Sequence, residues 1–147
     1  MFSNVSSAQQ SFDKASFFES MQSEDINNIN EQLKIVEASS MPEKNAYLGA
    51  LLMKKAGLSK GASNKLNLFK SGHKKLEESI KKNSSNAELR FLRLMVQEHA
   101  PGILGYKNDM QEDSEYIKKA YKDLPQVLQQ AISDYSKQSK ILKPADF

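Results

Sequence analysis

Three residues of this chain, Arg90, Arg93 and Gln97, have the types and the spacing for binding chemistry. They recur at i, i+3 and i+7, so on a helix with roughly 100° per residue they share one narrow polar face, which we call the arginine wedge. Two guanidinium groups one turn apart can bind a carboxylate or a phosphate through paired hydrogen bonds. The wedge therefore predicts a binding surface. The alternative is that its side chains form ion pairs with acidic residues of a neighbouring helix, Glu88 or residues 109–115 included.

The two histidines allow a weaker hypothesis, a metal-dependent enzyme. His73 and Glu77 stand four residues apart, a spacing that can hold a metal or form a base–carboxylate pair. Glu98 and His99 could complete a zinc site if the fold brought them to the first pair. His73, however, falls on the apolar side of its helix, where a hydrogen-bonded core histidine is the commoner role. Because cysteine, phosphate loops, nucleophile elbows and zinc motifs are all absent from the sequence, we expect no catalytic activity, metal or cofactor.

The segment 86–101 must position the wedge, and it reads as a helix capped by Asn86 and stopped by Pro101. Outside the wedge it is apolar almost all the way round. A helix of this kind is buried against several neighbours, so we expect it at the centre of the domain. In the linker that follows, Leu104 and Tyr106 should fold back on the core. The apolar positions of the helix are Ala87, Leu89, Phe91, Leu92, Leu94, Met95 and Val96.

Six further helical segments are expected around this one. Ser11 and Ser23 are the expected caps of the first two. Small residues such as Gly49 in the third, and Gly72 inside the fourth, predict a close approach between helices. No alternating apolar–polar run is long enough for a strand, and short loops favour antiparallel hairpins. The expected fold is all-α, with about seven helices in antiparallel hairpins, arranged as an α-solenoid or a helical bundle.

The composition is that of one globular domain, with 147 residues of which 39% are hydrophobic and 27% charged. No apolar run is long enough to span a bilayer. Residues 54–93 carry 11 basic and 3 acidic side chains, whereas residues 1–53 carry 3 and 7, and residues 94–147 carry 7 and 8. The basic middle can attract an anionic partner or pair with the acidic ends. Only Phe69 stands among its lysines, which argues against nucleic acid as the partner.

The N-terminus indicates export. Ser6 and Ala8 are small residues separated by one, as a signal-peptidase site requires, so residues 1–10 read as a residual signal-peptide tail of a periplasmic or secreted protein. The alternative is a disordered N-terminus of a cytoplasmic protein. We expect a single helical domain over residues 11–138 and a loose C-terminal tail over residues 139–147, although Ile141, Leu142 and Phe147 could pack onto the surface.

Part of the chain resembles known helical repeats. The run Tyr47–Ala50 within residues 43–57, a helix that ends near Asn83 and a new start at residues 86–88 resemble the rhythm of tetratricopeptide (TPR) repeats. The block 86–106 is also similar to small, exported, uncharacterised helical proteins of Bacteroidota-type bacteria. The first resemblance implies a TPR-like α-solenoid whose concave groove would carry the arginine wedge. The second implies export and no particular activity.

These observations lead to three expectations. The first is a non-catalytic, exported module that binds a protein or peptide, acidic ones included, through a groove carrying Arg90, Arg93 and Gln97. The second is a helical bundle that binds a small ligand or anion with the same arginines and with Tyr47 or Tyr106. The third is the metal-dependent enzyme. The sequence indicates no oligomeric state.

Overall fold

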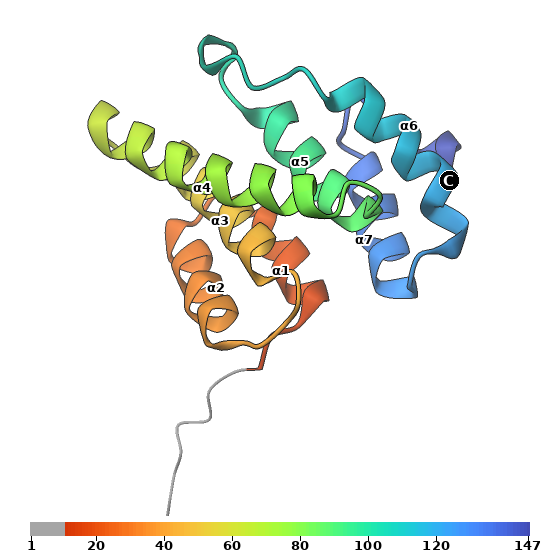
Figure 1. Ribbon diagram of the computed structural model, residues 1–147, viewed down its shortest axis with the longest axis horizontal. Coiled ribbons are helices and arrows are strands. Elements are labelled where there is room, and N and C mark those ends of the chain that lie inside the picture. The colour runs from red at the N-terminus through yellow and green to blue at the C-terminus, as the bar shows by residue number, and fades with distance from the viewer. Residues whose placement is uncertain (1–10) are drawn as a thin grey trace, which may run out of the picture.

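The computed structural model describes residues 11–147, in which seven α-helices and three short 3-10 turns are the regular elements (Figure 1). No strand occurs among these residues, so the prediction of an all-α fold with about seven helices is confirmed. The predicted signal-peptide tail lies outside the described residues. The elements are α1 (Lys14–Met21), α2 (Ile26–Ala38), α3 (Lys44–Leu58), α4 (Ala62–Lys82), α5 (Ala87–His99), η1 (Gly102–Leu104), α6 (Met110–Ala120), η2 (Tyr121–Asp123), α7 (Gln126–Ser136) and η3 (Pro144–Asp146).

Asp13, Asp25 and Asn86 cap α1, α2 and α5, each by accepting a hydrogen bond from a backbone N–H of the first turn. The cap at Asn86 was predicted, but the predictions of Ser11 and Ser23 were wrong. A carboxylate at a helix N-terminus is favoured by the free N–H groups and by the helix dipole. In both helices the aspartate two residues after the expected serine is therefore the N-cap. Ser23 still supports α2, since its Oγ accepts from the backbone N–H of Asp25 at 3.0 Å.

The helices α3 and α4 pack backbone to backbone where two glycines meet. A Cβ atom on Gly49 would lie 2.6 Å from the carbonyl oxygen of Gly72, and one on Gly72 would lie 2.5 Å from the carbonyl oxygen of Gly49. The predicted close approach of these helices is confirmed. Because both glycines lie about equally far from the short connecting loop, the two helices form an antiparallel hairpin, with the beginning of α4 at one edge of the molecule (Figure 1).

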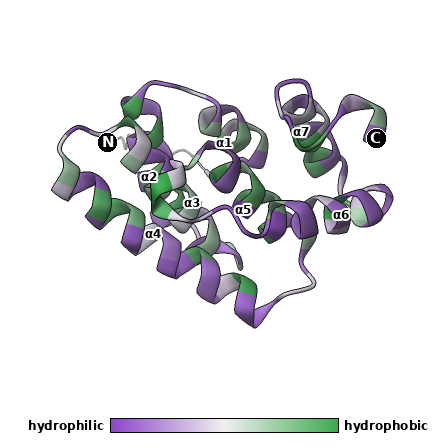
Figure 2. Cartoon of the chain, turned by 90° about the horizontal axis from the view of Figure 1, so that it is seen from above, coloured by the Kyte–Doolittle hydropathy of each residue, from purple (hydrophilic) through white to green (hydrophobic). Residues whose placement is uncertain are grey.

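The helix α5 is central, as predicted. It contacts α3, α4 and α6, and 10 of its 13 residues are buried. The first and the last helix also meet, since α1 packs against α2 and α7. In contrast, α4 is largely hydrophilic (Figure 2).

None of the described helices combines the length and the apolar character that a membrane span requires.

Residues 139–147 were expected to be loose, but they pack against the helices. The Ser139 Oγ and the Lys140 backbone N–H donate to the two carboxylate oxygens of Glu98, at 2.7 and 2.6 Å. Leu142 is fully buried, and the ring of Phe147 lies 4.6 Å from that of Tyr121 between centroids. A carboxylate at the end of α5 thus satisfies the backbone of a segment whose apolar side chains complete the core.

Candidate functional site

Arg93 lies at the centre of a buried ion-pair network between α4, α5 and α6. Its Nε donates to Oδ2 of Asp113 at 2.8 Å and its Nη2 to Oδ1 at 2.9 Å, which makes a bidentate pair. Its Nη1 donates to Oε1 of Glu77 at 3.0 Å. Arg93 is 6% exposed and Asp113 is fully buried. All three guanidinium nitrogens are therefore occupied by carboxylates of the same chain.

The second guanidinium group of the wedge is also engaged. The Nε of Arg90 donates to the carbonyl oxygen of Ser84 at 2.8 Å, and its Nη1 donates to Oδ1 of Asp113 at 3.1 Å. The Cζ atom lies 4.4 Å from the centre of the Tyr116 ring, a cation–π geometry. Arg90 thus shares Asp113 with Arg93 and holds the loop before α5 against α6.

Gln97 and Tyr106 extend the same network. The Nε2 of Gln97 donates to Oδ2 of Asp109 at 2.8 Å, and its Oε1 accepts from the Asp109 backbone N–H at 3.1 Å. The hydroxyl of Tyr106 donates to Glu77, the carboxylate that also binds Arg93. Gln97 is fully buried and Tyr106 nearly so. The structure therefore brings Tyr106 to the wedge, but inside the protein.

Tyr47, the other tyrosine considered for a ligand pocket, lies in a different cluster. It is fully buried, and its hydroxyl donates to Glu88. The Nζ of Lys14 lies 2.9 Å from the same carboxylate. This cluster joins α1, α3 and α5, and it shares no hydrogen-bond partner with the arginine wedge.

The protonation of the network follows from its burial. Burial raises the pKa of Asp113 above its ordinary value, although Arg93 and Arg90 oppose this effect. For Arg93, burial lowers the pKa, but the hydrogen bonds and charges of Asp113 and Glu77 outweigh it and leave the pKa above its ordinary value. Arg93 thus keeps its positive charge. The carboxylates buried beside it depend on that charge to balance their own.

The wedge consequently joins three helices rather than lining an open groove. Its ion pairs with Asp113, Asp109 and Glu112 are those that the sequence allowed as the alternative to a binding surface. Glu88, the other acidic candidate, binds Tyr47 and Lys14 instead.

The histidines lie in two separate surroundings. The ring of His73 packs against those of Tyr106 and Phe69, at 4.6 and 6.0 Å between centroids. The Nδ1 of His99 lies 3.0 Å from the carbonyl oxygen of Met95. Within residues 11–147, no group of three or more His, Asp or Glu side chains could hold a metal ion.

A cleft of about 620 Å³ lies between the α3–α4 hairpin, the end of α5 and the η1 turn. Three methionines from three different helices line it, which makes its surface deformable because methionine side chains are unbranched and flexible. We call it the apolar cleft. Its large apolar lining residues are Met21, Met53, Leu58, Leu66, Phe69, Met95, Val96, Ile103 and Leu104.

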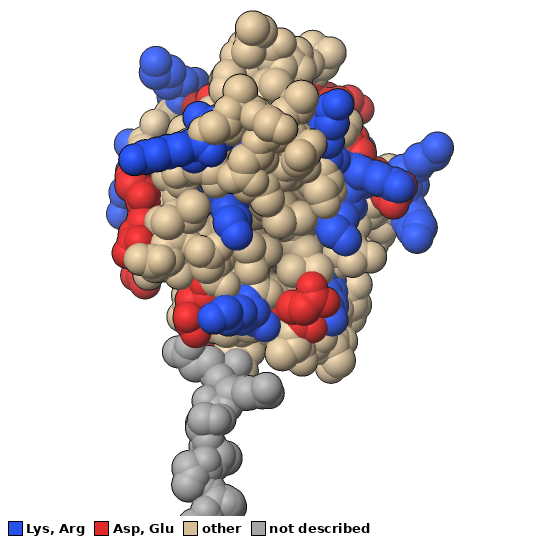
Figure 3. All heavy atoms as spheres, turned by 90° about the vertical axis from the view of Figure 1, so that its left-hand side faces the viewer, with Lys and Arg blue, Asp and Glu red and all other residues tan. Residues whose placement is uncertain are grey.

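The exposed large apolar side chains of the described residues all line this cleft. They are Leu66, Ile103 and Leu104, with exposed fractions of 42%, 94% and 37%. The prediction that Leu104 folds back on the core was therefore wrong in part, because η1 and Gly105 (φ 67°) turn the chain at the cleft's edge. Figure 3 shows a broad uncharged area on the side where α4 begins, with both basic and acidic side chains around it. Exposed large apolar side chains that gather at one place, instead of being scattered singly, call for an explanation.

Lysines lie before α4 and along its whole length. Lys54 and Lys65 line the cleft, and Lys54 lies 3.5 Å from Glu24, the single carboxylate among the lining residues. The other lysines between positions 55 and 82 form no ion pair with any described residue. Among the described residues, the acidic ends of the chain thus provide only Glu24 as a close partner for the lysines of residues 54–82, at Lys54. The other lysines are Lys55, Lys60, Lys65, Lys70, Lys74, Lys75, Lys81 and Lys82.

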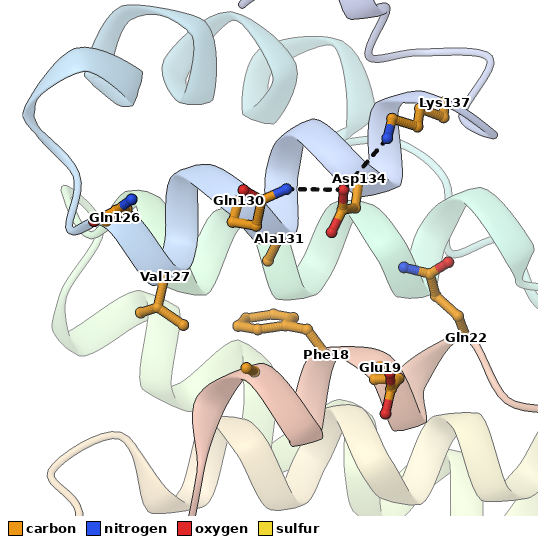
Figure 4. A pocket seen from close by; sticks show the side chains of 10 residues that line it. Phe18, Glu19, Gln22, Gln126, Val127, Gln130, Ala131, Asp134 and Lys137 are labelled. Carbon is orange, nitrogen blue, oxygen red and sulfur yellow. Dashed lines mark hydrogen bonds and ion pairs between the residues drawn. The ribbon is translucent and has the colours of Figure 1, made fainter.

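A second hollow, of about 820 Å³, lies between α1 and α7. Figure 4 shows Phe18 of α1 beneath Val127 and Ala131 of α7. Phe18 and Ala131 are already buried, and part of the polar rim is internally paired, since Asp134 accepts from Gln130 at 3.0 Å and lies 3.6 Å from the Nζ of Lys137. This hollow therefore offers less uncovered apolar surface than the apolar cleft.

Sequence reasoning missed the apolar cleft because its residues look like ordinary core positions. Met53, Leu66 and Phe69 fall on the apolar sides of their helices, and periodicity does not distinguish a covered side from an open one. One signal was present. Ile103 and Leu104 stand together between two glycines, and large apolar residues in such a turn are difficult to bury because loops run over the surface.

The comparisons with known proteins add no relative. No family model, no curated protein and no solved structure matches the chain. The TPR-like repeat, the similarity to exported bacterial proteins and the export itself stay predictions, and the functional argument depends on the geometry of the described residues.

Proposed function

We propose that this protein is a non-catalytic module that binds a segment of another protein in the apolar cleft. The observation that carries the proposal is the clustering of Leu66, Ile103 and Leu104, which are exposed and all line one cleft instead of being scattered over the surface. Covering apolar surface is the main favourable term in protein association.

The form of the cleft supports a protein segment as the occupant. Its floor is formed by Met53 and Met95, which are nearly buried, so an inserted side chain would meet a floor that is already packed. Its walls come from two separate parts of the chain, α4 and the η1 turn. Methionine side chains are unbranched and flexible, so this floor can adjust to the apolar side chains of a bound segment.

The arginine wedge does not compete with this assignment. A partner's carboxylate could reach Arg93 only by displacing Asp113 and Glu77, and that would leave those carboxylates without their cation. Breaking a buried ion pair in this way costs about 3–5 kcal/mol. The proposal of a binding module is therefore kept, with its surface moved from the wedge to the cleft.

A selection from a displayed peptide library tests the proposal. We expect enrichment of peptides with large apolar residues, and we expect the double variant Leu66→Ser, Ile103→Ser to lose their binding. Val127→Ser in the hollow between α1 and α7 is the matched control, and it should bind as the unmodified protein does. If the library yields no binder, or if Val127→Ser removes binding and the cleft variant does not, the proposal is wrong.

A small apolar ligand is the second candidate. The observation in its favour is the volume of the cleft, about 620 Å³, which lies within the roughly 300–1,000 Å³ of ligand sites. A medium-chain fatty acid is a suitable probe, because Lys65 at the rim could bind its carboxylate. Calorimetric titration distinguishes the two candidates, since saturable binding of the fatty acid without any peptide binder would favour the small ligand.

A further inference from the structure

We infer that the segment bound in the apolar cleft is an amphipathic helix whose polar face is acidic. This inference rests on the proposed function and specifies the partner of the same cleft. It follows from three observations: the secondary structure around the cleft, the charge around its rim, and the state of the arginines.

The first observation selects a helix. An extended peptide gains affinity by adding a strand to a sheet edge, and no strand exists within residues 11–147. Proline-rich segments bind in grooves lined by aromatic side chains. The lining of this cleft has two phenyl or phenol rings, those of Phe69 and Tyr135. A cleft between packed helices with aliphatic and methionine walls is the geometry that accepts the apolar face of a helix.

The second observation sets the charge of the partner. The single lining carboxylate, Glu24, already lies beside Lys54. Lys65 lines the cleft, and Lys60 and Lys70 are exposed five residues before and after it along the chain; none of the three forms an ion pair with the described residues. A helix with its apolar face in the cleft would bring its polar face to these lysines. Acidic residues there meet complementary charge, and basic residues meet repulsion.

The third observation separates an acidic helix from nucleic acid. Phosphate recognition favours arginine and stacked aromatic rings. Arg90 and Arg93 are both bound to Asp113, and Phe69, the aromatic residue among the lysines, packs against His73 and Tyr106. The side chains left free are lysines beside an apolar surface. That combination matches an apolar helix with carboxylates better than a phosphate backbone.

Three synthetic helical peptides test the inference. They share one apolar face of Leu and Phe, and their polar faces carry Glu, Gln or Lys. Fluorescence anisotropy at about 0.02 M salt, where charge is least screened, should show the Glu peptide binding about tenfold more tightly than the Gln peptide, and the Lys peptide more weakly than both. The advantage of the Glu peptide should shrink at about 0.3 M salt.

Matched charge variants locate the effect. The triple variant Lys60→Gln, Lys65→Gln, Lys70→Gln should remove the advantage of the Glu peptide, whereas Lys119→Gln, Lys122→Gln, Lys143→Gln, with the same change of charge, should keep it. Equal binding of the three peptides would overturn the acidic face and leave the proposed function standing. Failure of all three peptides would overturn the inference and count against the proposed function as well. Binding of a single-stranded DNA oligonucleotide with the same lysine dependence, but without dependence on Ile103, would also overturn it.

Discussion

The arginine wedge and the apolar cleft lie on different sides of the same helix, α5, and differ in how far the chain itself satisfies them. In the wedge, Arg93 meets two carboxylates within 3.0 Å and is almost completely enclosed. In the cleft, Met95 forms part of a floor whose walls are left uncovered, with Ile103 94% exposed. A side chain that could bind a ligand strongly therefore does not form a site when the fold has already given it a partner.

We expect the wedge to contribute stability, and we propose that the cleft contributes binding. Variants that separate these two properties test the distinction.

Removing the central cation of the wedge should have the largest effect. Arg93→Ala leaves the buried Asp113 without its bidentate partner, and we expect the free energy of unfolding to fall by about 3–5 kcal/mol. Glu112→Ala is the matched control, because Glu112 is an exposed member of the same ion-pair network. It should change stability by less than about 0.5 kcal/mol. Urea denaturation followed by circular dichroism measures both. If Arg93→Ala lowers the free energy of unfolding only slightly, the wedge is not needed for stability and could be a binding surface.

Alkaline pH should destabilise the protein through three buried tyrosines. Burial raises the pKa of Tyr47, Tyr106 and Tyr135, and the neighbouring carboxylates raise it further. Since the folded pKa lies above the unfolded value of about 10, the unfolded chain releases these protons first. Stability should be fully retained below pH 10 and fall above it, by up to about 1.4 kcal/mol per pH unit for each phenol.

Absorbance at the phenolate wavelength, recorded with circular dichroism, checks this prediction. Three of the five tyrosines should ionise together with the loss of helical signal. Reversible ionisation of all five with the helices intact would show that Tyr47 and Tyr106 are not enclosed as the structure has them.

The hairpin that forms one wall of the cleft should be sensitive to a single methyl group. Gly72→Ala places a Cβ 2.5 Å from the carbonyl oxygen of Gly49, so we expect a loss of about 1–3 kcal/mol. Gly57→Ala lies in α3 with nothing within 4 Å of the added atom, and it should stabilise the protein by up to about 1 kcal/mol through helix propensity. Thermal unfolding separates the two, and equal effects of the two variants would contradict the close approach.

The smallest effect on stability is expected in the cleft. Ile103→Ser alters a side chain that is 94% exposed, so the free energy of unfolding should change by less than about 0.5 kcal/mol. The same variant should weaken partner binding. Chemical denaturation beside a peptide-binding assay gives both numbers, and a large loss of stability would mean that Ile103 is part of the core.

Much of the fold was predictable from the sequence, because it depends on local and periodic signals. The Asn86 cap, the apolar α5 and the small residues at Gly49 and Gly72 act over a few residues or along one helix face. The prediction of a loose C-terminal tail was wrong, because the tail is held by Glu98, 41 residues before Ser139. Contacts of that range leave no periodic pattern.

The site was less predictable for the same reason. The spacing of Arg90 and Arg93 shows that they share a face, but whether that face is open depends on Asp113, 20 residues beyond Arg93. The sequence offered both outcomes and could not choose between them. The openness of the cleft is likewise a property of three elements together, and only the Ile103–Leu104 pair between glycines indicated it.

We propose that partners bind in the apolar cleft and not at the arginine wedge. Methionine methyl NMR during titration with the Glu-faced peptide tests it most directly. Met21, Met53 and Met95 line the cleft, whereas Met41 and Met110 lie outside it and Met110 begins α6 beside the wedge. We predict saturable shifts of the three cleft signals with Met41 and Met110 unchanged. Shifts of Met110 with the cleft signals unchanged would contradict the account.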